Sequence, residues 1–338
     1  MAREPLLTFT DRGIFCPAGG FHIDPWRPVD RAVITHGHSD HARPGHGAYL
    51  ATQAALPVMR HRLGEIAAEG LGWGEERRIG DVAVSLHPAG HVPGSAQVRV
   101  ERGGEVWVVS GDYKVEPDGL SEPFEPVRAH AFVSECTFGL PIFRWRPQAE
   151  VMAEIAAWWR ANAAAGRVSL IGAYGLGKAQ RILAALPGLG PVFTHGAVEA
   201  PTAILRAQGY RLPATALARA GGVPAGALVI APPSALAGPW AARLPAPGAE
   251  GVAQGFASGW MALRGIRRRR GVTRGFVLSD HADWPGLNAA IAATGAPRVF
   301  VTHGYTAPFS RWLTDQGLDA AVVPTAFSAE GGDPEGAE

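Results

Sequence analysis

The feature that most constrains this chain is a short apolar segment that ends in closely spaced side chains of metal-ligand type. Residues 33–41 read VITHGHSDH, so three histidines and one aspartate fall within six positions. Side chains at alternating positions of an extended segment point the same way, so His36 and His38 can share one metal ion. Asp40 and His41 lie in the turn beyond and can face a second ion. Imidazole and carboxylate ligands suit zinc, manganese or iron, and the pattern therefore predicts a two-metal centre.

Three later segments also place a histidine or an aspartate at the end of an apolar run. His91 closes PAGH, Asp112 closes WVVSGD, and His303 closes RVFVTH. Together with HGHSDH, these segments resemble the ligand motifs of the metallo-β-lactamase superfamily. The resemblance implies two divalent ions, zinc or manganese: one held by His36, His38 and His91, the other by Asp40, His41 and His303, with Asp112 between them.

Asp24 precedes Pro25 in FHIDP and matches the first motif of the same superfamily. The resemblance implies that this carboxylate holds the histidine loop without binding metal, because an outer carboxylate fixes the tautomer and orientation of an imidazole. An aspartate that only makes the turn before a proline is the alternative interpretation, and Asp24 by itself does not decide between them.

Composition and cysteine content limit the classes of protein to which this chain can belong. The chain has 338 residues, 47% hydrophobic and 18% charged, which is typical of a soluble globular enzyme with one large domain or two. Cys16 and Cys136 form no C-x-x-C pair, which excludes a disulfide scaffold and fits a reducing compartment. We interpret Cys136 as a small buried thiol. The N-terminus lacks the apolar core of a signal peptide, and no segment approaches about 20 apolar residues, so we expect a cytoplasmic protein without a membrane span.

Net charge gives no global signal for a nucleic-acid partner, because it is only +1. A local signal is present: six arginines lie between Arg264 and Arg274, and such a cluster can neutralise the phosphates of a strand. The candidate contacts within it are Arg267, Arg268, Arg269 and Arg270. A solvated helix face in an arginine-rich chain explains the cluster equally well, and the sequence leaves both interpretations open.

Strand and helix patterns predict an α/β chain with an insertion. Up to about residue 140, short apolar strands alternate with glycine and histidine turns. The middle section then alternates helices, through 151–161 and 181–186, with strands such as 168–172, as a parallel sheet requires. His303 lies beyond this section, so the metal-binding fold must pause and resume. We expect a first part over 1–145, an inserted domain over 146–262, a second part over 263–327 and a flexible tail over 328–338.

Three further motifs narrow the resemblance. The run FVSECT ends an apolar strand in Glu135, and FVLSDHAD follows another strand with Ser279 and His281. With His303, these segments resemble the A, B and C motifs of β-CASP enzymes, the nucleic-acid-processing branch of the superfamily. The resemblance implies a metallo-β-lactamase αββα sandwich with an inserted β-CASP α/β domain. It also implies phosphodiester hydrolysis in which Asp40 orients the attacking water or accepts its proton, while His281, beside Glu135, protonates the leaving oxygen.

The sequence GAYGLGK at 172–178 joins an apolar strand to a helix and resembles the turn by which the inserted domain of these nucleases faces its substrate. Gly175 and Gly177 let the backbone approach a phosphate closely, the following helix directs amide groups at an anion, and Lys178 adds a cation. Ser279 is a further candidate contact. A simple strand-to-helix turn is the alternative, because no serine or threonine follows the lysine as in a P-loop.

Within β-CASP, the sequence SGWM at 258–261 and the run GFVLSDHADW at 275–284 resemble the bacterial ligase-associated DNA exonucleases. That resemblance implies a DNA-repair enzyme that degrades DNA from 5′ to 3′, prefers a 5′-phosphate and works with a DNA ligase and a helicase. His303 departs from the pattern, because eukaryotic crosslink-repair relatives carry valine at motif C whereas RNA-processing members carry histidine. An RNA-processing nuclease therefore stays an alternative.

Two other function classes share part of the pattern. A small-molecule ester, thioester or lactone hydrolase would use the same seven ligands, but it predicts neither the insertion nor Glu135 and His281. A non-enzymatic scaffold that binds nucleic acid predicts the loss of ligands, and none of the seven is lost.

Overall fold

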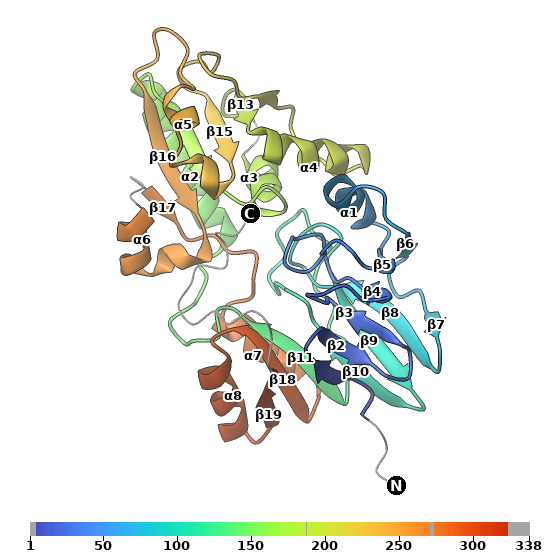
Figure 1. The fold of residues 1–338 in the computed structure, drawn as a ribbon. Coiled ribbons are helices and arrows are strands. Elements are labelled where there is room, and N and C mark those ends of the chain that lie inside the picture. Colours follow the sequence, from blue (N-terminus) through green and yellow to red (C-terminus); the bar gives the residue numbers. More distant parts are fainter. Residues whose placement is uncertain (1–4, 187, 271–273, 324–338) are drawn as a thin grey trace. The chain divides into compact units, whose positions relative to one another are not determined.

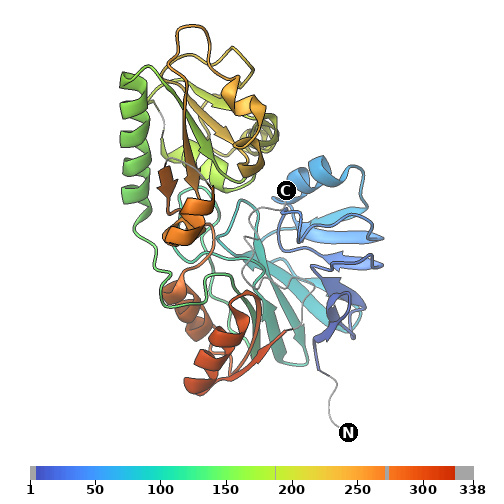
Figure 2. The same ribbon diagram turned by 60° about the vertical axis from the view of Figure 1, so that its left-hand side comes forward.

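The computed structural model describes residues 5–186, 188–270 and 274–323, without the side chains of Arg267, Arg269 and Arg270. These residues form two compact units, drawn in Figure 1 and Figure 2. The first unit comprises the described residues of Met1–Pro117, Ser121–Arg144 and His281–Gly332, and the second those of Asp118–Leu120 and Trp145–Asp280. The expected tail over 328–338 lies outside the described residues.

Two sheets form the centre of the first unit. The strands of one are β1 (Thr8–Thr10), β2 (Gly13–Cys16), β3 (Phe21–Ile23), β4 (Arg31–Val33), β5 (Ala48–Thr52) and β6 (Ala68–Leu71), in that spatial order. The strands of the other are β7 (Arg77–Ile79), β8 (Val82–Pro88), β9 (Ala96–Arg102), β10 (Glu105–Val109), β11 (Ala131–Cys136), β18 (Arg298–Gly304) and β19 (Asp319–Val322). Buried side chains of both sheets, such as Val33, Leu50, Val98 and Trp107, form one apolar cluster, so the sheets pack face to face.

Helices cover the outer face of each of these sheets. Helix α1 (Leu56–Leu63) contributes Met59 to a cluster with Ala32 and Tyr49 of the first sheet. Helices α7 (Trp284–Thr294) and α8 (Thr306–Asp315) pack on Val108 and Phe132 of the second sheet. The order of layers is therefore helix, sheet, sheet, helix. This mixed α/β arrangement is compatible with the expected metallo-β-lactamase sandwich.

A parallel sheet organises the second unit. Its strands, in spatial order, are β14 (Ala216–Leu217), β13 (Val192–Thr194), β15 (Leu228–Ala231), β12 (Val168–Gly172), β16 (Val252–Ala257) and β17 (Arg274–Phe276). Every described pair in this sheet is parallel, which confirms the predicted alternation. The helices are α2 (Gln148–Ala164), α3 (Lys178–Ala185), α4 (Gly196–Ala207), α5 (Pro239–Ala242) and α6 (Arg264–Arg270), with 3-10 turns at Pro233–Ala235 and Gly259–Ala262.

The end of the second unit differs from the expected boundary at 262. Described residues from 263 to 280 belong to the second unit. The physical reason is strand pairing, because β17 adds to the edge of the parallel sheet beside β16 and the Ser258 amide donates to the Phe276 carbonyl. Among the described residues, no helix has both the length and the apolar character that a bilayer span needs.

Candidate metal centre

The predicted ligands follow the carboxyl ends of strands in the first unit. His36 and His38 come after β4, His91 after β8, and Asp112 after β10, while His303 lies near the end of β18. Strands β10, β11 and β18 are parallel neighbours, so side chains at their carboxyl ends meet although they lie far apart in the sequence. Four of these residues, His36, His38, His91 and Asp112, bring one ligand atom each to within 4.8 Å of one another.

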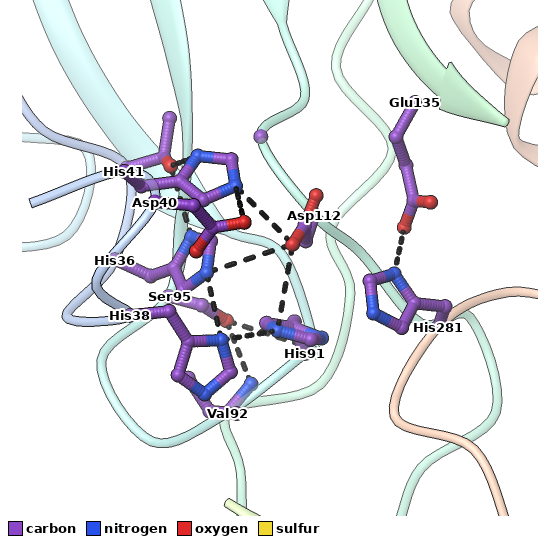
Figure 3. Close-up of polar contacts among 12 residues, drawn as sticks. His36, His38, Asp40, His41, His91, Val92, Ser95, Asp112, Glu135 and His281 are labelled. Carbon is purple, nitrogen blue, oxygen red and sulfur yellow. Dashed lines mark hydrogen bonds and ion pairs between the residues drawn. The ribbon is translucent and has the colours of Figure 1, made fainter. Parts of the chain in front are cut away.

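The distances within this group of four suit a metal ion. The Nδ1 atom of His38 lies 3.1 Å from His36 Nε2 and 3.2 Å from His91 Nε2 (Figure 3). The Asp112 Oδ2 atom lies 3.6 Å from His36 Nε2 and 3.8 Å from His91 Nε2. Ligand atoms of a tetrahedral ion with bonds of about 2.0–2.1 Å are separated by about 3.3–3.4 Å. Three imidazoles and one carboxylate at these spacings fit a zinc-type or manganese-type ion.

The second predicted group shares Asp112 but is more loosely arranged. His41 Nε2 lies 3.3 Å from Asp112 Oδ2 and 3.7 Å from Asp40 Oδ2. The His303 ring stacks against the His41 ring with 5.5 Å between centroids. The Asp40 side chain is 43% exposed, whereas His41 is buried and His303 is half-buried. The structure therefore brings all four residues to one place, with Asp112 Oδ2 facing both groups.

Asp24 and Thr35 hold two of the imidazoles from behind. Asp24 Oδ2 accepts from His41 Nδ1 at 2.7 Å and from the Thr35 hydroxyl at 2.6 Å, and Asp24 Oδ1 accepts from the Thr35 amide at 2.8 Å. The Thr35 hydroxyl lies 3.0 Å from His36 Nδ1. Because the hydroxyl proton goes to Asp24, this network assigns the His36 proton to Nδ1. Both imidazoles then carry a proton on Nδ1, and Nε2 is the atom that faces the centre.

Sequence reasoning proposed Asp24 for this place and missed Thr35. Thr35 directly precedes His36, and its hydroxyl can accept a hydrogen bond from a histidine while it donates one to a carboxylate. A threonine at the end of an apolar strand gives no such signal by itself, since its role depends on the distant Asp24.

Burial and charge set the protonation of the ligands. Burial lowers the pKa of His36 well below its usual value, with further lowering by His41 and His38, so this imidazole is neutral. Burial also opposes ionisation of Asp112, yet the neighbouring His41 and His281 lower its pKa well below the usual range. Burial acts against the charged form of His41 too, but Asp112, Asp40 and Asp24 raise its pKa well above the usual value. A metal ion that bound His41 would therefore displace a proton.

Glu135 and His281 form a hydrogen-bonded pair beside the ligands. Glu135 Oε1 accepts from His281 Nδ1 at 2.8 Å and from the Tyr113 amide at 3.0 Å, and Oε2 accepts from the Thr137 amide at 3.1 Å. Glu135 is 1% exposed, so these contacts fix its carboxylate. Glu135, His281 and Asp112 offer ligand atoms within 4.8 Å of one another. Figure 3 shows His281 next to His91, and their ring centroids are 4.6 Å apart. Because Glu135 holds Nδ1, the His281 ring has a fixed orientation beside the cluster and its Nε2 is left for proton transfer.

The predicted nucleic-acid contacts lie in the second unit. Lys178 begins α3 and is 1% exposed; its Nζ lies 3.6 Å from Asp280 Oδ2 and 4.6 Å from the centre of the Tyr174 ring. Gln180 binds the turn before it, accepting from the Gly177 amide at 2.7 Å and donating to the Gly175 carbonyl at 2.8 Å. The sequence pattern predicted that this helix begins at residue 181. In the structure it begins at Lys178, because Gln180 closes the turn before it.

Arg181 joins α3 to the segment that carries Ser279. Its Nη1 donates to the Ser279 carbonyl at 2.5 Å and to Asp280 Oδ1 at 3.0 Å. Sequence reasoning missed both Arg181 and Asp280, because neither stands out among 31 basic and 30 acidic residues. Of the arginine cluster, α6 carries Arg268, which is exposed, and the side chains of Arg267, Arg269 and Arg270 lie outside the described residues.

No known family model matches the chain. It is 31% identical over 320 residues to a probable DNA ligase of Opitutus terrae, an alignment that covers 92% of this chain and 30% of that protein. It is 31% identical over 204 residues to ribonuclease TTHA0252 of Thermus thermophilus, covering 52% of this chain and 45% of the relative. The third match is transcription termination factor FttA of Pyrococcus abyssi, 31% identical over 136 residues, 39% of this chain and 20% of the factor.

The chain therefore spans less than half the length of each of these relatives. Among solved structures, a protein of unknown function from Enterococcus faecalis V583 has a similar fold, with a TM-score of 0.57 and 12% identity. The superposition covers 82% of this chain and 76% of that one. At this identity the likeness concerns the fold alone.

Proposed function

We propose that this chain is a metal-dependent nuclease with a metallo-β-lactamase sandwich and an inserted β-CASP domain. The observation that carries the proposal is the junction of two groups in the first unit: the ligand cluster around Asp112 and the Glu135–His281 pair that meets it. Metal ligands alone serve many hydrolases, whereas an oriented imidazole beside them adds an acid for a poor leaving group. The relatives named as a DNA ligase and a ribonuclease support a nucleic-acid substrate.

The proposed metal set comprises His36, His38 and His91 for one divalent ion, Asp40, His41 and His303 for a second, and Asp112 for both. Two such ions supply a Lewis acid for the phosphodiester and lower the pKa of water at the site. Zinc and manganese both suit imidazole and carboxylate ligands. Asp24 and Thr35 keep His41 and His36 in the tautomer that ligation needs.

The chain's own residues supply the proton transfers in this proposal. Asp40 is the more exposed carboxylate of the cluster and orients the attacking water or accepts its proton. Glu135 keeps the His281 proton on Nδ1 and stabilises the imidazolium form, so that Nε2 can carry a second proton to the leaving oxygen. The usual pKa of histidine, about 6.5, permits this transfer near neutral pH.

DNA is the substrate that we favour, with 5′-to-3′ exonuclease action, a preference for a 5′-phosphate and a role in DNA repair. The support is that 92% of this chain aligns with part of a protein named a probable DNA ligase. The same alignment supports a functional association with a ligase; a helicase partner is inferred from the sequence resemblance only. The turn Gly175–Gly177, Lys178 and Ser279 are the proposed phosphate contacts, and Arg267–Arg270 the proposed strand contacts.

An RNA-processing nuclease is the second candidate. The match to ribonuclease TTHA0252 favours it, since that alignment covers about half of this chain. His303 favours it as well, because histidine at motif C resembles the RNA-processing members. The two candidates share the metal centre and differ in the sugar that the substrate presents.

A substrate panel separates these candidates. The full chain is freed of metal by chelation, reloaded with Mn²⁺, Mg²⁺ or Zn²⁺, and given end-labelled single-stranded DNA and RNA of one sequence, each with and without a 5′-phosphate. We expect faster loss of 5′-phosphorylated DNA and the release of 5′-terminal products first. Faster RNA cleavage in every metal would favour the ribonuclease, and products released first from the 3′ end would contradict the polarity.

A further inference from the structure

The strand that carries His303 is irregular next to that residue. Strands β18 and β11 pair in parallel register up to Thr302 and Glu135, after which Gly304 pairs with Cys136. His303 is therefore the additional residue of a β-bulge. A bulge bends its strand and redirects the side chain of the additional residue, and bulges are frequent beside active sites.

The backbone of His303 has a conformation that histidine seldom adopts. Its φ is +54°, and in the part of the chain that the structure describes only Asp24 among the other non-glycine residues has a positive φ. A conformation of this kind is unfavourable in isolation and persists where the surrounding contacts enforce it. The contacts around the bulge therefore determine where the imidazole of His303 points.

Cys136 contacts the chain on both sides of His303, since its Sγ also lies 3.5 Å from the Thr302 carbonyl oxygen. Its thiol donates a hydrogen bond to the His303 carbonyl, with Sγ 2.9 Å from the oxygen. Its own carbonyl accepts from the Tyr305 amide at 3.1 Å. Gly304 lies so close that a Cβ there would be 2.4 Å from the Cys136 carbonyl oxygen. One residue of β11 thus holds the bulge through its side chain and its main chain.

We propose that Cys136 is a positioning residue for His303. The Cys136 thiol fixes the bulge and so directs the His303 imidazole toward the metal centre. This proposal rests on the proposed function, which makes His303 a metal ligand. The competing explanation is packing, because Cys136 is fully buried in the apolar cluster of β11, α7 and α8. The main-chain contact with Tyr305 is available to any residue at position 136, so side-chain substitution isolates the thiol.

Three variants of the full chain separate positioning from packing. Cys136→Ala removes the donor and some volume, whereas Cys136→Ser removes a similar volume but keeps a donor. Cys16→Ala is the matched control, because Cys16 is also fully buried but lies in the cluster between the two sheets. Two quantities are measured: the affinities for successive Mn²⁺ equivalents, and amide hydrogen exchange across 302–306 in the metal-free chain.

We expect Cys136→Ala to lower the affinity for the second Mn²⁺ ion about tenfold and to speed hydrogen exchange of the Tyr305 amide. The affinity for the first Mn²⁺ ion should change little. Cys136→Ser should recover most of both effects, and Cys16→Ala should change neither. Equal effects of the two alanine variants, or no rescue by serine, would overturn the proposal. If the unmodified chain binds no Mn²⁺, the proposed function fails, while the exchange comparison still decides whether the thiol holds the bulge.

Discussion

Four imidazoles of the centre have a polar partner behind the nitrogen that faces away from the cluster. The pairs are His41 with Asp24, His36 with Thr35, His303 with Thr302 and His281 with Glu135. A partner of this kind fixes the orientation of the ring and decides which nitrogen is left for a metal or a proton. At the scale of single residues, the proposed function therefore depends on the side chains behind the proposed ligands as much as on the ligands themselves.

Asp24→Asn tests that dependence. Asparagine tolerates a positive φ such as the +42° of Asp24, so the substitution keeps the backbone and removes the carboxylate. We expect metal affinity to fall about 10–100-fold, because His41 and Thr35 lose the acceptor that orients them. The measurement is a Mn²⁺ titration against a chelating dye. Asp315→Asn, an exposed aspartate of α8, is the control and should bind metal normally; an unchanged affinity in Asp24→Asn would contradict the role of the carboxylate.

His281→Ala tests the proton transfer. We expect hydrolysis to slow by about 10²–10⁴-fold, the usual range for a lost acid or base, while bound metal stays the same. Glu135→Gln should slow it less and shift the alkaline limb of the pH–rate profile to lower pH, because the carboxylate no longer stabilises the charged imidazole that acts as the acid. Rate measurements from pH 5 to 9 check both variants. Near-full activity of His281→Ala would remove this residue from the mechanism.

At the scale of elements, strand ends and their irregularities decide where the side chains go. The four-layer first unit aligns β4, β8, β10, β11 and β18 so that their carboxyl ends carry the centre. Strand β18 alone would alternate its side chains between the sheet faces, and the bulge at His303 breaks that alternation. The bulge in turn requires glycine at 304, where φ is +79°.

Gly304→Ala tests this requirement against a matched glycine. Alanine at 304 is strained by the positive φ and meets the backbone of Cys136 and Thr137 at 2.4 Å, so we expect a loss of about 3 kcal/mol or more. Gly317 also has a positive φ, +87°, but nothing lies within 4 Å of an added Cβ. Gly317→Ala should therefore cost only about 1–2 kcal/mol. Urea unfolding measures both; equal losses would show that crowding at the bulge is unimportant.

Glu199 of α4 gives the second unit a pH-dependent contribution. Its carboxylate accepts from Thr194 at the end of β13, from Thr215 at 2.6 Å and from Arg206 at 3.1 Å. Burial raises the pKa of this carboxyl, but those hydrogen bonds lower it more, so the net shift is downward. A lowered pKa means that the stability is present above the unfolded-state pKa, about 4.3, and is lost as the pH falls through the folded-state value.

Glu199→Gln should therefore destabilise the second unit by about 1 kcal/mol at pH 7, a discounted figure because a quarter of the side chain is exposed. The difference from the unmodified chain should shrink below about pH 4. Denaturant unfolding at pH 7 and pH 3.5 gives both numbers, with Glu250→Gln, an exposed loop residue, as the control. A constant difference at the two pH values would disprove the linkage.

At the scale of the whole molecule, sequence and structure inform different parts of the account. The ligand types, their spacing and the strands before them could be predicted from HGHSDH and the later motifs, because each signal is local. The parallel sheet of the second unit followed from its alternating pattern, and β12 lies over the predicted 168–172. The roles of Thr35, Arg181 and Cys136 could not be predicted, since each depends on a partner that only tertiary structure brings near.

The central claim is that the cluster around Asp112 is a metal centre that hydrolyses nucleic acid. It is tested most directly by cleavage of end-labelled, 5′-phosphorylated single-stranded DNA and RNA by the chelated chain, before and after addition of Mn²⁺, beside an Asp112→Asn variant whose folding is verified by its unfolding transition. The account predicts no cleavage without metal, recovery with Mn²⁺, and no recovery in Asp112→Asn. Cleavage that persists in excess chelator, or no cleavage of either nucleic acid with Mn²⁺, Mg²⁺ or Zn²⁺, would contradict it.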